Sequence, residues 1–398
     1  MIRSIYLKNF FSFKEQKIDL GNTNYLVGIN GAGKSNLIKA FRLLKATLTE
    51  GHLEDLIINK WGGFDAVFFK GGETEEAPSF TVMYEFSHEV LAEYGYRFQE
   101  PVYYKIQVKK VAGTQNYTLK EKFGTKPGWQ DGYQYFMASN GNGWAREGER
   151  SDQQHSVKYH LDTLSDSMLS QLKDSDRYAQ ISTLRKAIAD MSIYTYFNTT
   201  ETSPIRKPAA PTTATKLISD GSNLPQLLNW ININYKKDYK NIKNSLNSIN
   251  PNITDINFHP IGTNIELLLE EENLNSAVHV AHVSDGTLRF LCLLAIIHNP
   301  KRGKFVCIDE PEVGLHPDMI SEIMEAMEEI SDKTQFVITT HSELILNQTT
   351  IDNVIVCEKD ENNASYIKTF RTEEYKKWAT EYATGNLWRS GDLGGNRY

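Results

Sequence analysis

The sequence predicts an α/β protein in which a parallel or mixed sheet carries a phosphate-binding loop, accompanied by an antiparallel β meander and a helical subdomain. Three observations predict this class. The apolar stretch "NYLVGIN" runs into a glycine-rich loop and then into a helical pattern. Two later apolar stretches, "KFVCIDE" and "QFVITT", end in polar residues, as strands of parallel sheets often do. Residues 78 to 160 alternate aromatic and polar side chains, which is typical of paired antiparallel strands.

Composition indicates a soluble globular chain. Its 398 residues are 40% hydrophobic and 23% charged, enough for a sizeable core. The three cysteines, Cys292, Cys307 and Cys357, lie in apolar stretches without metal-type spacing, so we expect buried, reduced thiols. No signal segment or apolar run of about 18 residues occurs, so we expect a cytoplasmic protein without a membrane span. The net charge of -7 argues against a wholly basic nucleic-acid binder but allows a local basic patch.

The N-terminal half begins with two predicted strands, "IRSIYLKNF" and "FKEQKIDL". After the glycine loop, "KSNLIKAFRLLKATL" has apolar residues at helical spacing. The meander follows as "SFTVMYEFSH", "VYYKIQVKKV", "NYTLKEKFG" and "YQYFMAS", with a Gly/Asn turn at 140 to 143, and 161 to 192 is predicted to be helical. We therefore divide the chain, a single unit over 1–398, into an N-terminal lobe (1–90) and a β-rich and helical insert (90–200).

The C-terminal lobe (217–398) is preceded by "TSPIRKPAAPTTATK" (202–216), whose three prolines predict a mobile loop. A helix at "LPQLLNWININY" and strands at "INFHPIG", "NIELLLEE" and "AVHVAHV" are expected next. Helices over 287–298 and 318–331 then alternate with the strands "KFVCIDE", "QFVITT" and "NVIVCEK". This alternation predicts parallel pairing.

The glycine loop matches GxxxxGK[ST] in full, with a strand before it and a helix after it. Its backbone amides and the helix N-terminus would bind nucleotide phosphates, and its lysine would neutralise their charge. We expect ATP as substrate. The residues expected to bind it are Gly28, Asn30, Gly31, Ala32, Gly33, Lys34, Ser35 and Asn36.

Paired carboxylates end the strand "FVCIDE". We expect Ser35 and Asp309 to bind Mg²⁺, and Glu310 to activate the attacking water. If Glu310 lacks that role, Glu312 is the next candidate. His341 follows a further strand; a single histidine there is usually structural, but its position one strand after the carboxylates favours a catalytic role near the γ-phosphate.

"HVSDGTLRF" (282–290) is a second helix start with small residues, distant from the phosphate loop. Its free amides and hydroxyl would suit an anion, and we expect it to contact the γ-phosphate of a nucleotide bound by a second copy of the chain. The trans-acting residues would be Ser284, Asp285, Gly286 and Thr287. The alternative is an ordinary N-capped core helix.

The motifs "GINGAGKSN", "HVSDGTLRF", "CIDEPEVGLHP" and "ITTHSELIL", in this order, resemble the ABC-type ATPase heads of the SMC, RecF and OLD families. The chain is most similar to the compact, bacterial, defence-associated RecF/OLD-like AAA ATPases, and "SDGSNLPQLL" and "LWRSGDLGGN" also resemble that group. The resemblance implies an ABC-ATPase-type head with a helical signature subdomain, in which these motifs are Walker A, the signature, Walker B with a D-loop (Gly314 to Pro317), and the switch histidine His341. It further implies a homodimer or higher homo-oligomer joined through sandwiched ATP.

The sequence departs from the family pattern in several places. SDGT replaces the LSGGQ of transporters, and no clear Q-loop glutamine follows the first helix, where "WGGFDAVFFKGG" stands instead. Coiled coils are absent. The chain ends about 57 residues after His341, so we expect no Toprim nuclease domain.

Three functions stay open. The first is an ATP-dependent dimeric switch that controls a separately encoded nuclease or toxin, in anti-phage defence. The second is a RecF-like repair ATPase that binds DNA, and the third is a scaffold in which ATP joins the subunits with little turnover. Basic residues interleaved with aromatics in the meander could contact nucleic acid, although solvated strand faces explain the same pattern. These residues are Lys105, Lys109, Lys110, Lys120, Lys122 and Lys126 beside Tyr103, Tyr104, Tyr117 and Phe123.

Overall fold

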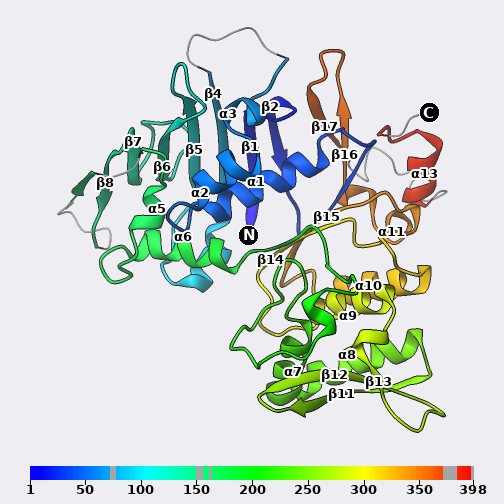
Figure 1. Cartoon of the computed structure of the whole chain (residues 1–398). Coiled ribbons are helices and arrows are strands. Elements are labelled where there is room, and N and C mark those ends of the chain that lie inside the picture. Colours follow the sequence, from blue (N-terminus) through cyan, green and yellow to red (C-terminus); the bar gives the residue numbers. More distant parts are fainter. Residues whose placement is uncertain (72–77, 149–155, 161–163, 371–382, 396–398) are drawn as a thin grey trace.

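A computed structural model describes residues 1–71, 78–148, 156–160, 164–370 and 383–395. Two large sheets and the helix between them form the upper part of the molecule in Figure 1, and a helical lobe with a small third sheet forms the lower part. The mixed α/β class predicted from the sequence is confirmed. No helix in these ranges is long and apolar enough to cross a membrane.

The largest sheet is antiparallel and contains the predicted meander. Its strand order is β2-β1-β4-β5-β6-β7-β8-β9, so the meander extends a sheet that the N-terminal hairpin begins. The strands are β1 Ile2–Phe10, β2 Phe13–Asp19, β4 Ser79–Phe86, β5 Val102–Lys110, β6 Tyr117–Gly124, β7 Gln134–Ser139, β8 Asn142–Arg146 and β9 Ser156–His160.

The second sheet has the order β10-β14-β15-β3-β16-β17, and only β17 pairs in antiparallel fashion. Its edge strand β10 lies at the end of the stretch that the sequence predicts to be helical; Met191 ends the helix before it, and three residues pair with β14. The strands are β3 Thr23–Val27, β10 Ser192–Tyr194, β14 Phe305–Asp309, β15 Gln335–Thr339, β16 Val354–Lys359 and β17 Ser365–Thr369.

Helix α1 (Lys34–Ala46) joins the two sheets, because it buries apolar side chains along most of its length. The ring of Phe41 lies 4.9 Å from that of Phe305 on β14, and the Tyr84 hydroxyl on β4 donates to the Ala40 carbonyl at 2.5 Å. Shorter helices surround this core. They are α2 His52–Glu54, η1 Asp55–Lys60, α3 Phe64–Val67, α4 His88–Leu91, η2 Ala92–Tyr94, α5 Met168–Gln171 and α6 Ala179–Asp190.

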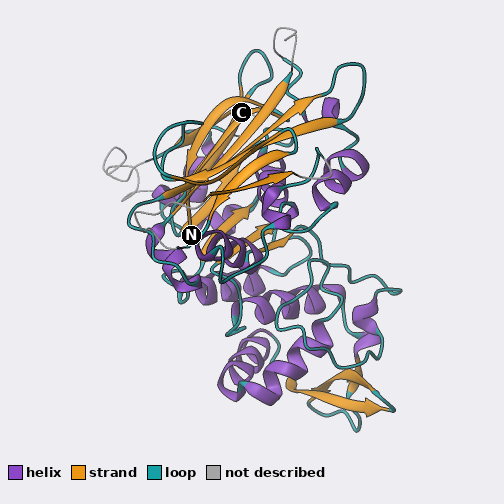
Figure 2. Cartoon of the chain, turned by 90° about the vertical axis from the view of Figure 1, so that its left-hand side faces the viewer, coloured by secondary structure: helices purple, strands orange, loops and turns teal. Residues whose placement is uncertain are grey.

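The lower lobe places helices between the parallel sheet and a three-stranded antiparallel sheet, which Figure 2 shows at the end of the molecule opposite the large sheet. Of the predicted strand "AVHVAHV", only Val278–His279 pairs, and a short 3₁₀ helix follows. The elements are η3 Pro204–Arg206, α7 Leu224–Asn234, α8 Lys236–Ile249, β11 Ile253–Ile261, β12 Asn264–Glu271, β13 Val278–His279, η4 Val280–His282 and α9 Asp285–Ile297.

The remaining helices flank the parallel sheet towards the C-terminus. They are α10 Pro317–Glu328, α11 Glu343–Asn347, η5 Ile351–Asn353 and α13 Thr384–Ser390. The three cysteines are buried and unpaired, as predicted. Burial raises the pKa of the Cys357 thiol to about 12, so this thiol stays protonated at neutral pH.

Candidate functional site

The predicted site residues of three motifs meet at one edge of the parallel sheet. In the strand register, Asp309 is opposite Thr339, and Thr339 is opposite Leu26, two residues before the phosphate loop. The Thr340 amide also donates to the Leu26 carbonyl at 3.0 Å. Because these strands are parallel, their carboxyl ends coincide, which is where open α/β sheets bind ligands.

The phosphate loop needs glycine at two tight positions. Gly28 has φ +147°, and a Cβ there would lie 2.3 Å from the Cys357 carbonyl oxygen on β16. Gly33 has φ +118°, and a Cβ there would lie 2.5 Å from the Ser365 Oγ on β17. Both positions combine a left-handed backbone with no room for a side chain. The loop shape therefore depends on contact with β16 and β17 as well as on its own sequence.

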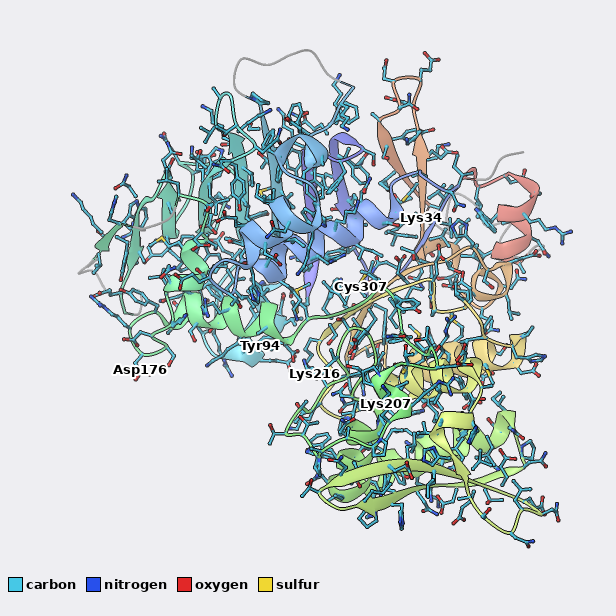
Figure 3. The ribbon with its side chains drawn as sticks, viewed as in Figure 1. Lys34, Tyr94, Asp176, Lys207, Lys216 and Cys307 are labelled. Atoms are coloured by element: carbon cyan, nitrogen blue, oxygen red, sulfur yellow. The ribbon has the colours of Figure 1, made fainter. Side chains whose placement is uncertain are left out.

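Lys34 lies across the loop that it follows. Its ammonium donates to the carbonyls of Gly28 at 2.8 Å and Ile29 at 3.3 Å, and the residue is only 6% exposed. Burial lowers its pKa, while the carboxylates of Glu310 and Asp309 act in the opposite direction. Figure 3 shows Lys34 where α1 meets the parallel sheet. This places a cation with neutral partners beside the carboxylates.

Hydrogen bonds from two serine hydroxyls also stabilise the phosphate loop. Ser365 donates to the Ala32 carbonyl at 2.6 Å, its Oγ lies 2.7 Å from the Ser12 hydroxyl oxygen, and the Asn36 amide donates to Ser12 at 2.8 Å. Neither serine was predicted as a site residue. Each belongs to a segment remote in sequence from the loop, so no local pattern marks them.

Asp309 ends β14 and accepts a short hydrogen bond from the Thr339 hydroxyl. Burial raises the pKa of its carboxyl, and the neighbouring Glu310 adds to this, whereas the Thr339 hydrogen bond and Lys34 lower it. No cluster of three or more His, Cys, Asp or Glu ligands occurs in the described ranges. The available donors, the Asp309 carboxylate and the exposed Ser35 hydroxyl, are hard oxygens that suit Mg²⁺, which in such sites takes its other ligands from phosphates and water.

Glu310 holds a strained backbone. Its φ is +47°, and its amide donates to the Thr339 carbonyl at 3.1 Å and to the Thr339 hydroxyl at 3.0 Å. A non-glycine residue in this region costs about 1–3 kcal/mol, and such residues cluster at functional sites. The strain directs the half-buried Glu310 carboxylate towards His341, whose Nε2 lies 3.5 Å from Oε1.

His341 is neutral at this site near pH 7. Burial lowers its pKa from 6.5, and the charge of Lys34 lowers it further, against the opposing pull of the carboxylates. Its Nε2 is buried and makes no hydrogen bond within the described chain. The imidazole ring that contacts the Glu310 carboxylate is therefore neutral, and the two do not form an ion pair. Its Nε2 is available to bind a ligand.

Glu312 supports the turn that carries His341. Its Oε1 accepts from the Thr340 hydroxyl at 2.8 Å and from the His341 amide at 2.7 Å, while its Oε2 is buried without a hydrogen-bond partner. These bonds give Glu312 a positioning role and make it a poor second candidate for a general base.

The signature turn begins α9 as the alternative interpretation expects. The Ser284 hydroxyl accepts from the Thr287 amide at 3.2 Å and lies 2.8 Å from the Thr287 hydroxyl, so it is a true N-cap. Ser284 and Asp285 are nevertheless exposed, whereas Gly286 and Thr287 are half-buried. Capping and anion contact are compatible, because a capped first turn still has further amides to donate.

Arg206 holds the signature turn in place through hydrogen bonds and an ion pair. It is 8% exposed, donates to the carbonyls of Val280, Ala281 and Val283, and reaches the Asp285 carboxylate at 2.5 Å. Thus the 202–216 loop is anchored at its start, and a bridge between Ala209 and Ile265 anchors it again. The Asp285 charge is neutralised within the chain.

The signature turn and the D-loop contact each other in the same chain. A Cβ on Gly286 would lie 2.8 Å from the Gly314 carbonyl oxygen, and Arg289 Nη1 donates to the Val313 carbonyl at 2.9 Å. Any side chain at Gly286 would therefore displace the D-loop.

A segment other than "WGGFDAVFFKGG" lies beside the carboxylates. Residues 194–197, which follow β10, line a cavity of about 160 Å³ together with Arg289, Asp309 and Glu310. In "WGGFDAVFFKGG", which stands after the first helix where no clear Q-loop glutamine was found, Phe64 and Phe68 stack on each other and Phe64 stacks on Phe80, in the core of the large sheet.

The C-terminal "GDLGG" contacts the phosphate loop. The Gly395 amide donates to Glu358 Oε1 at 2.9 Å, and a Cβ on Gly395 would lie 3.3 Å from the Gly28 Cα and 2.7 Å from Val356 Cγ1. Gly394 and Gly395 both have positive φ. The sequence identifies this tail as a family-like motif but does not predict what it contacts. In the structure it lies against Gly28, the first glycine of the phosphate loop.

Comparisons with known proteins identify the family and the fold of the chain. The profile of the family described as "AAA domain, putative AbiEii toxin, Type IV TA system" matches residues 24–347. A crystal structure of an Smc head bound to the C-terminal winged-helix domain of ScpA superposes with a TM-score of 0.59 at 14% identity, covering 94% of this chain and 99% of that chain. A Pyrococcus furiosus Smc head with an extended coiled coil, bound to the C-terminal domain of ScpA, gives a TM-score of 0.56 at 13% identity, covering 96% and 98%. The fold is therefore that of an SMC-type ATPase head.

Proposed function

The chain belongs to this family of AAA domains, and we propose that it binds and hydrolyses ATP as a dimeric switch that controls a separately encoded nuclease or toxin, in anti-phage defence. One observation carries the ATPase part of the proposal. The phosphate loop, the Asp309–Glu310 pair and His341 come from three motifs and meet at one sheet edge.

Each residue has a role that its surroundings support. Lys34, held by neutral carbonyls, is free to pair with the β- and γ-phosphates. Mg²⁺, held by Ser35, Asp309 and the phosphates, would neutralise charge on the phosphoryl group. Glu310 accepts a proton from the attacking water, and the neutral ring of His341 hydrogen-bonds the γ-phosphate oxygen or that water.

The position of the signature turn supports the proposed dimer. Ser284 is exposed, and its contacts in the described chain are with its own helix rather than with the phosphate loop. Arg206 binds the Asp285 carboxylate, which removes a charge that would repel phosphate. A second copy, related by a two-fold axis, would bring this turn to the γ-phosphate and complete both sites.

Complementation tests the trans arrangement. Ser284→Asp keeps an N-cap, because Asp caps as well as Ser, but places a carboxylate against the partner's γ-phosphate. It is preferable to a change at Gly286, which would displace the D-loop within its own chain. Lys34→Ala and Ser284→Asp homodimers should each be inactive. When the two are mixed, half the dimers pair one of each and hold one intact site, so roughly a quarter of the wild-type sites should return.

Ser284→Asn is the matched control, since it is neutral, similar in size and also an N-cap; its homodimer should retain ATPase activity. Crosslinking verifies that heterodimers form. Heterodimers without recovered activity, together with a fully active dilute monomer, would refute the trans arrangement.

Control of an effector is tested with the trapped states. Glu310→Gln should hold ATP and the closed dimer, and Lys34→Ala should hold neither. The product of a neighbouring gene, co-expressed with each variant, should co-purify with one state and not the other. If equal amounts of the partner co-purify with both variants, partner binding does not depend on the nucleotide state, and the proposed switch is rejected.

A DNA-binding ATPase is the second candidate, and one observation favours it. On the outer face of the large sheet, the ammonium groups of Lys105 and Lys120 lie 4.6 and 4.2 Å from the ring centre of Trp129. Fewer of the basic and aromatic residues named in the sequence are free to contact nucleic acid than the pattern suggests. Lys110 pairs with Asp65, Lys126 with Glu100, and Lys122 is buried, while Tyr104, Tyr117 and Phe123 belong to the core. Stimulation of the ATPase by DNA, lost in Lys105→Gln/Lys120→Gln, would support this candidate.

A further inference from the structure

A second cavity, of about 700 Å³, is lined in part by the edge strand β10. The C-terminal half of α1, the turn into η1, and residues 216–219 enclose it. Its volume falls within the range of small-molecule sites. No residue of the phosphate loop lines it.

The lining carries an excess of positive charge. Five basic side chains face the cavity and Asp55 is the only acidic one; the basic residues are Arg42, Lys45, His52, Lys60 and Lys216. Asp55 is paired with Lys60 at 2.8 Å. Lys216 is paired at 2.5 Å with Asp190, which also accepts from the Tyr94 hydroxyl and the Lys304 amide. Figure 3 shows Tyr94 and Lys216 close together at this junction.

Among the lysines and the arginine that line the cavity, Lys45 and Arg42 have no carboxylate partner in the described residues. Lys45 donates to the carbonyls of Ala189 and Met191 at the end of α6, which fix its position without cancelling its charge. Burial and the charge of Lys216 lower the pKa of Lys45 to about 8, and a bound anion would raise it. Arg42, half-buried, makes no hydrogen bond or ion pair within the described chain.

We propose that this cavity binds a phosphate-bearing small molecule of nucleotide size. Its phosphate would lie between Arg42, Lys45 and Lys216, because a guanidinium and two ammonium groups together favour a multiply charged oxyanion. The hydroxyls of Ser192 and Ser219 offer further donors, and Leu48, Leu56 and Ile193 supply apolar wall for the rest of the molecule.

The cavity also bears on the catalytic carboxylates. Tyr194 and Thr195 line both this cavity and the smaller one that contains Asp309 and Glu310. A ligand held against β10 would therefore alter the ATPase rate by shifting these two residues. This regulatory step rests on the proposed function; the binding itself does not.

Binding is tested in the Lys34→Ala variant, which removes the phosphate-loop cation. AMP and inorganic pyrophosphate are titrated by calorimetry, with adenosine as the phosphate-free probe, and acylation of Lys45 is followed by mass spectrometry. We expect AMP and pyrophosphate to bind and to protect Lys45, and adenosine to do neither. Adding Arg42→Gln should weaken binding about 10- to 100-fold, as loss of a charged hydrogen bond does. Ser219→Asp, at an exposed position of the rim, should weaken it as well.

Arg97→Gln is the matched control, since Arg97 is exposed and outside the cavity. Equal affinity and equal protection in Arg42→Gln and Arg97→Gln would overturn the proposal. Protection of Lys45 by an oligonucleotide alone, with none by AMP or pyrophosphate, would overturn the small-ligand assignment. Binding that is lost with Arg42→Gln while the wild-type protein hydrolyses no ATP would retain the cavity and refute only the proposed ATPase.

Discussion

Replacing Glu312 with alanine should slow ATP hydrolysis through His341, without removing a group that touches the reacting atoms. Glu312 Oε1 accepts two hydrogen bonds, from the Thr340 hydroxyl and from the His341 amide. Both donors belong to the turn that follows β15. Without their acceptor, the turn can adopt other conformations, and the imidazole loses its fixed position beside Glu310.

The magnitude follows from the bonds that are lost and the strain that is relieved. A hydrogen bond to a charged group contributes about 1.5–3 kcal/mol, and the lower value suits a half-buried carboxylate, so two bonds contribute about 3 kcal/mol. Alanine also removes the Glu312 Oε2, which is buried without a hydrogen-bond partner. Removing this unsatisfied atom offsets the loss by about 1 kcal/mol. The net loss of about 2 kcal/mol corresponds to a rate decrease of roughly 30-fold.

A double-mutant cycle separates positioning from direct catalysis. We expect Glu312→Ala/His341→Ala to be no more than about 3-fold slower than His341→Ala, because Glu312 acts on a side chain that is already absent. Glu312→Gln, which keeps an acceptor oxygen, should stay close to the wild-type rate. Single-turnover hydrolysis measures each step. If Glu312→Ala still costs about 10²–10⁴-fold in the His341→Ala background, Glu312 is a general base and the reasoning is wrong.

Four further changes have defined outcomes. Glu310→Gln should bind ATP normally and hydrolyse it about 10²–10⁴-fold more slowly in a phosphate-release assay; an unchanged rate would exclude Glu310 as the base. Lys34→Ala should weaken ATP binding in calorimetry, and unchanged affinity would place the main ATP site elsewhere. Gly395→Ala should weaken ATP binding because its Cβ meets the phosphate loop, whereas Gly113→Ala, with similar φ and nothing within 4 Å, should not. The His341 pKa is lowered from 6.5, so the unfolded chain binds more protons and stability falls as the pH drops below about 6.5. Urea unfolding at pH 7.5 and 5.5 should show a smaller loss for His341→Asn than for wild type; equal losses would contradict the pKa direction.

Local patterns predicted most of the fold because each pattern has its own period. The apolar spacing of 34–48 predicted α1, and the alternation of 78–160 predicted four of the six strands that pair there in sequence order. Strand β10 escaped detection because it has three residues, and it is specified by pairing with β14, which lies more than a hundred residues away. The proline-rich 202–216, predicted to be a loop, contains the short η3, and nothing local shows that Arg206 is buried.

The same distinction holds at the candidate site. Lys34, Asp309, Glu310 and His341 were predicted because phosphate chemistry requires particular residue types at particular spacings. The residues that support them follow no such rule. Ser365 binds the phosphate loop from 333 positions away, and Glu312 supports His341 from the next strand end. Their roles depend on which strands are neighbours, and strand order was not determined by any local pattern.

The Arg206–Asp285 pair bears on the proposal that the signature turn contacts a nucleotide bound by a second chain. An acidic residue at a phosphate-binding turn repels its ligand unless its charge is cancelled, and Arg206 cancels it at 2.5 Å while remaining buried. Arg206 belongs to the same connection as residues 194–197, which line the cavity of Asp309 and Glu310. Residues 197–206 and the hydrogen bonds of Arg206 therefore connect the cavity of the carboxylates to the signature turn. Within one chain, this connection links the site proposed to hydrolyse one nucleotide to the turn proposed to close on the other.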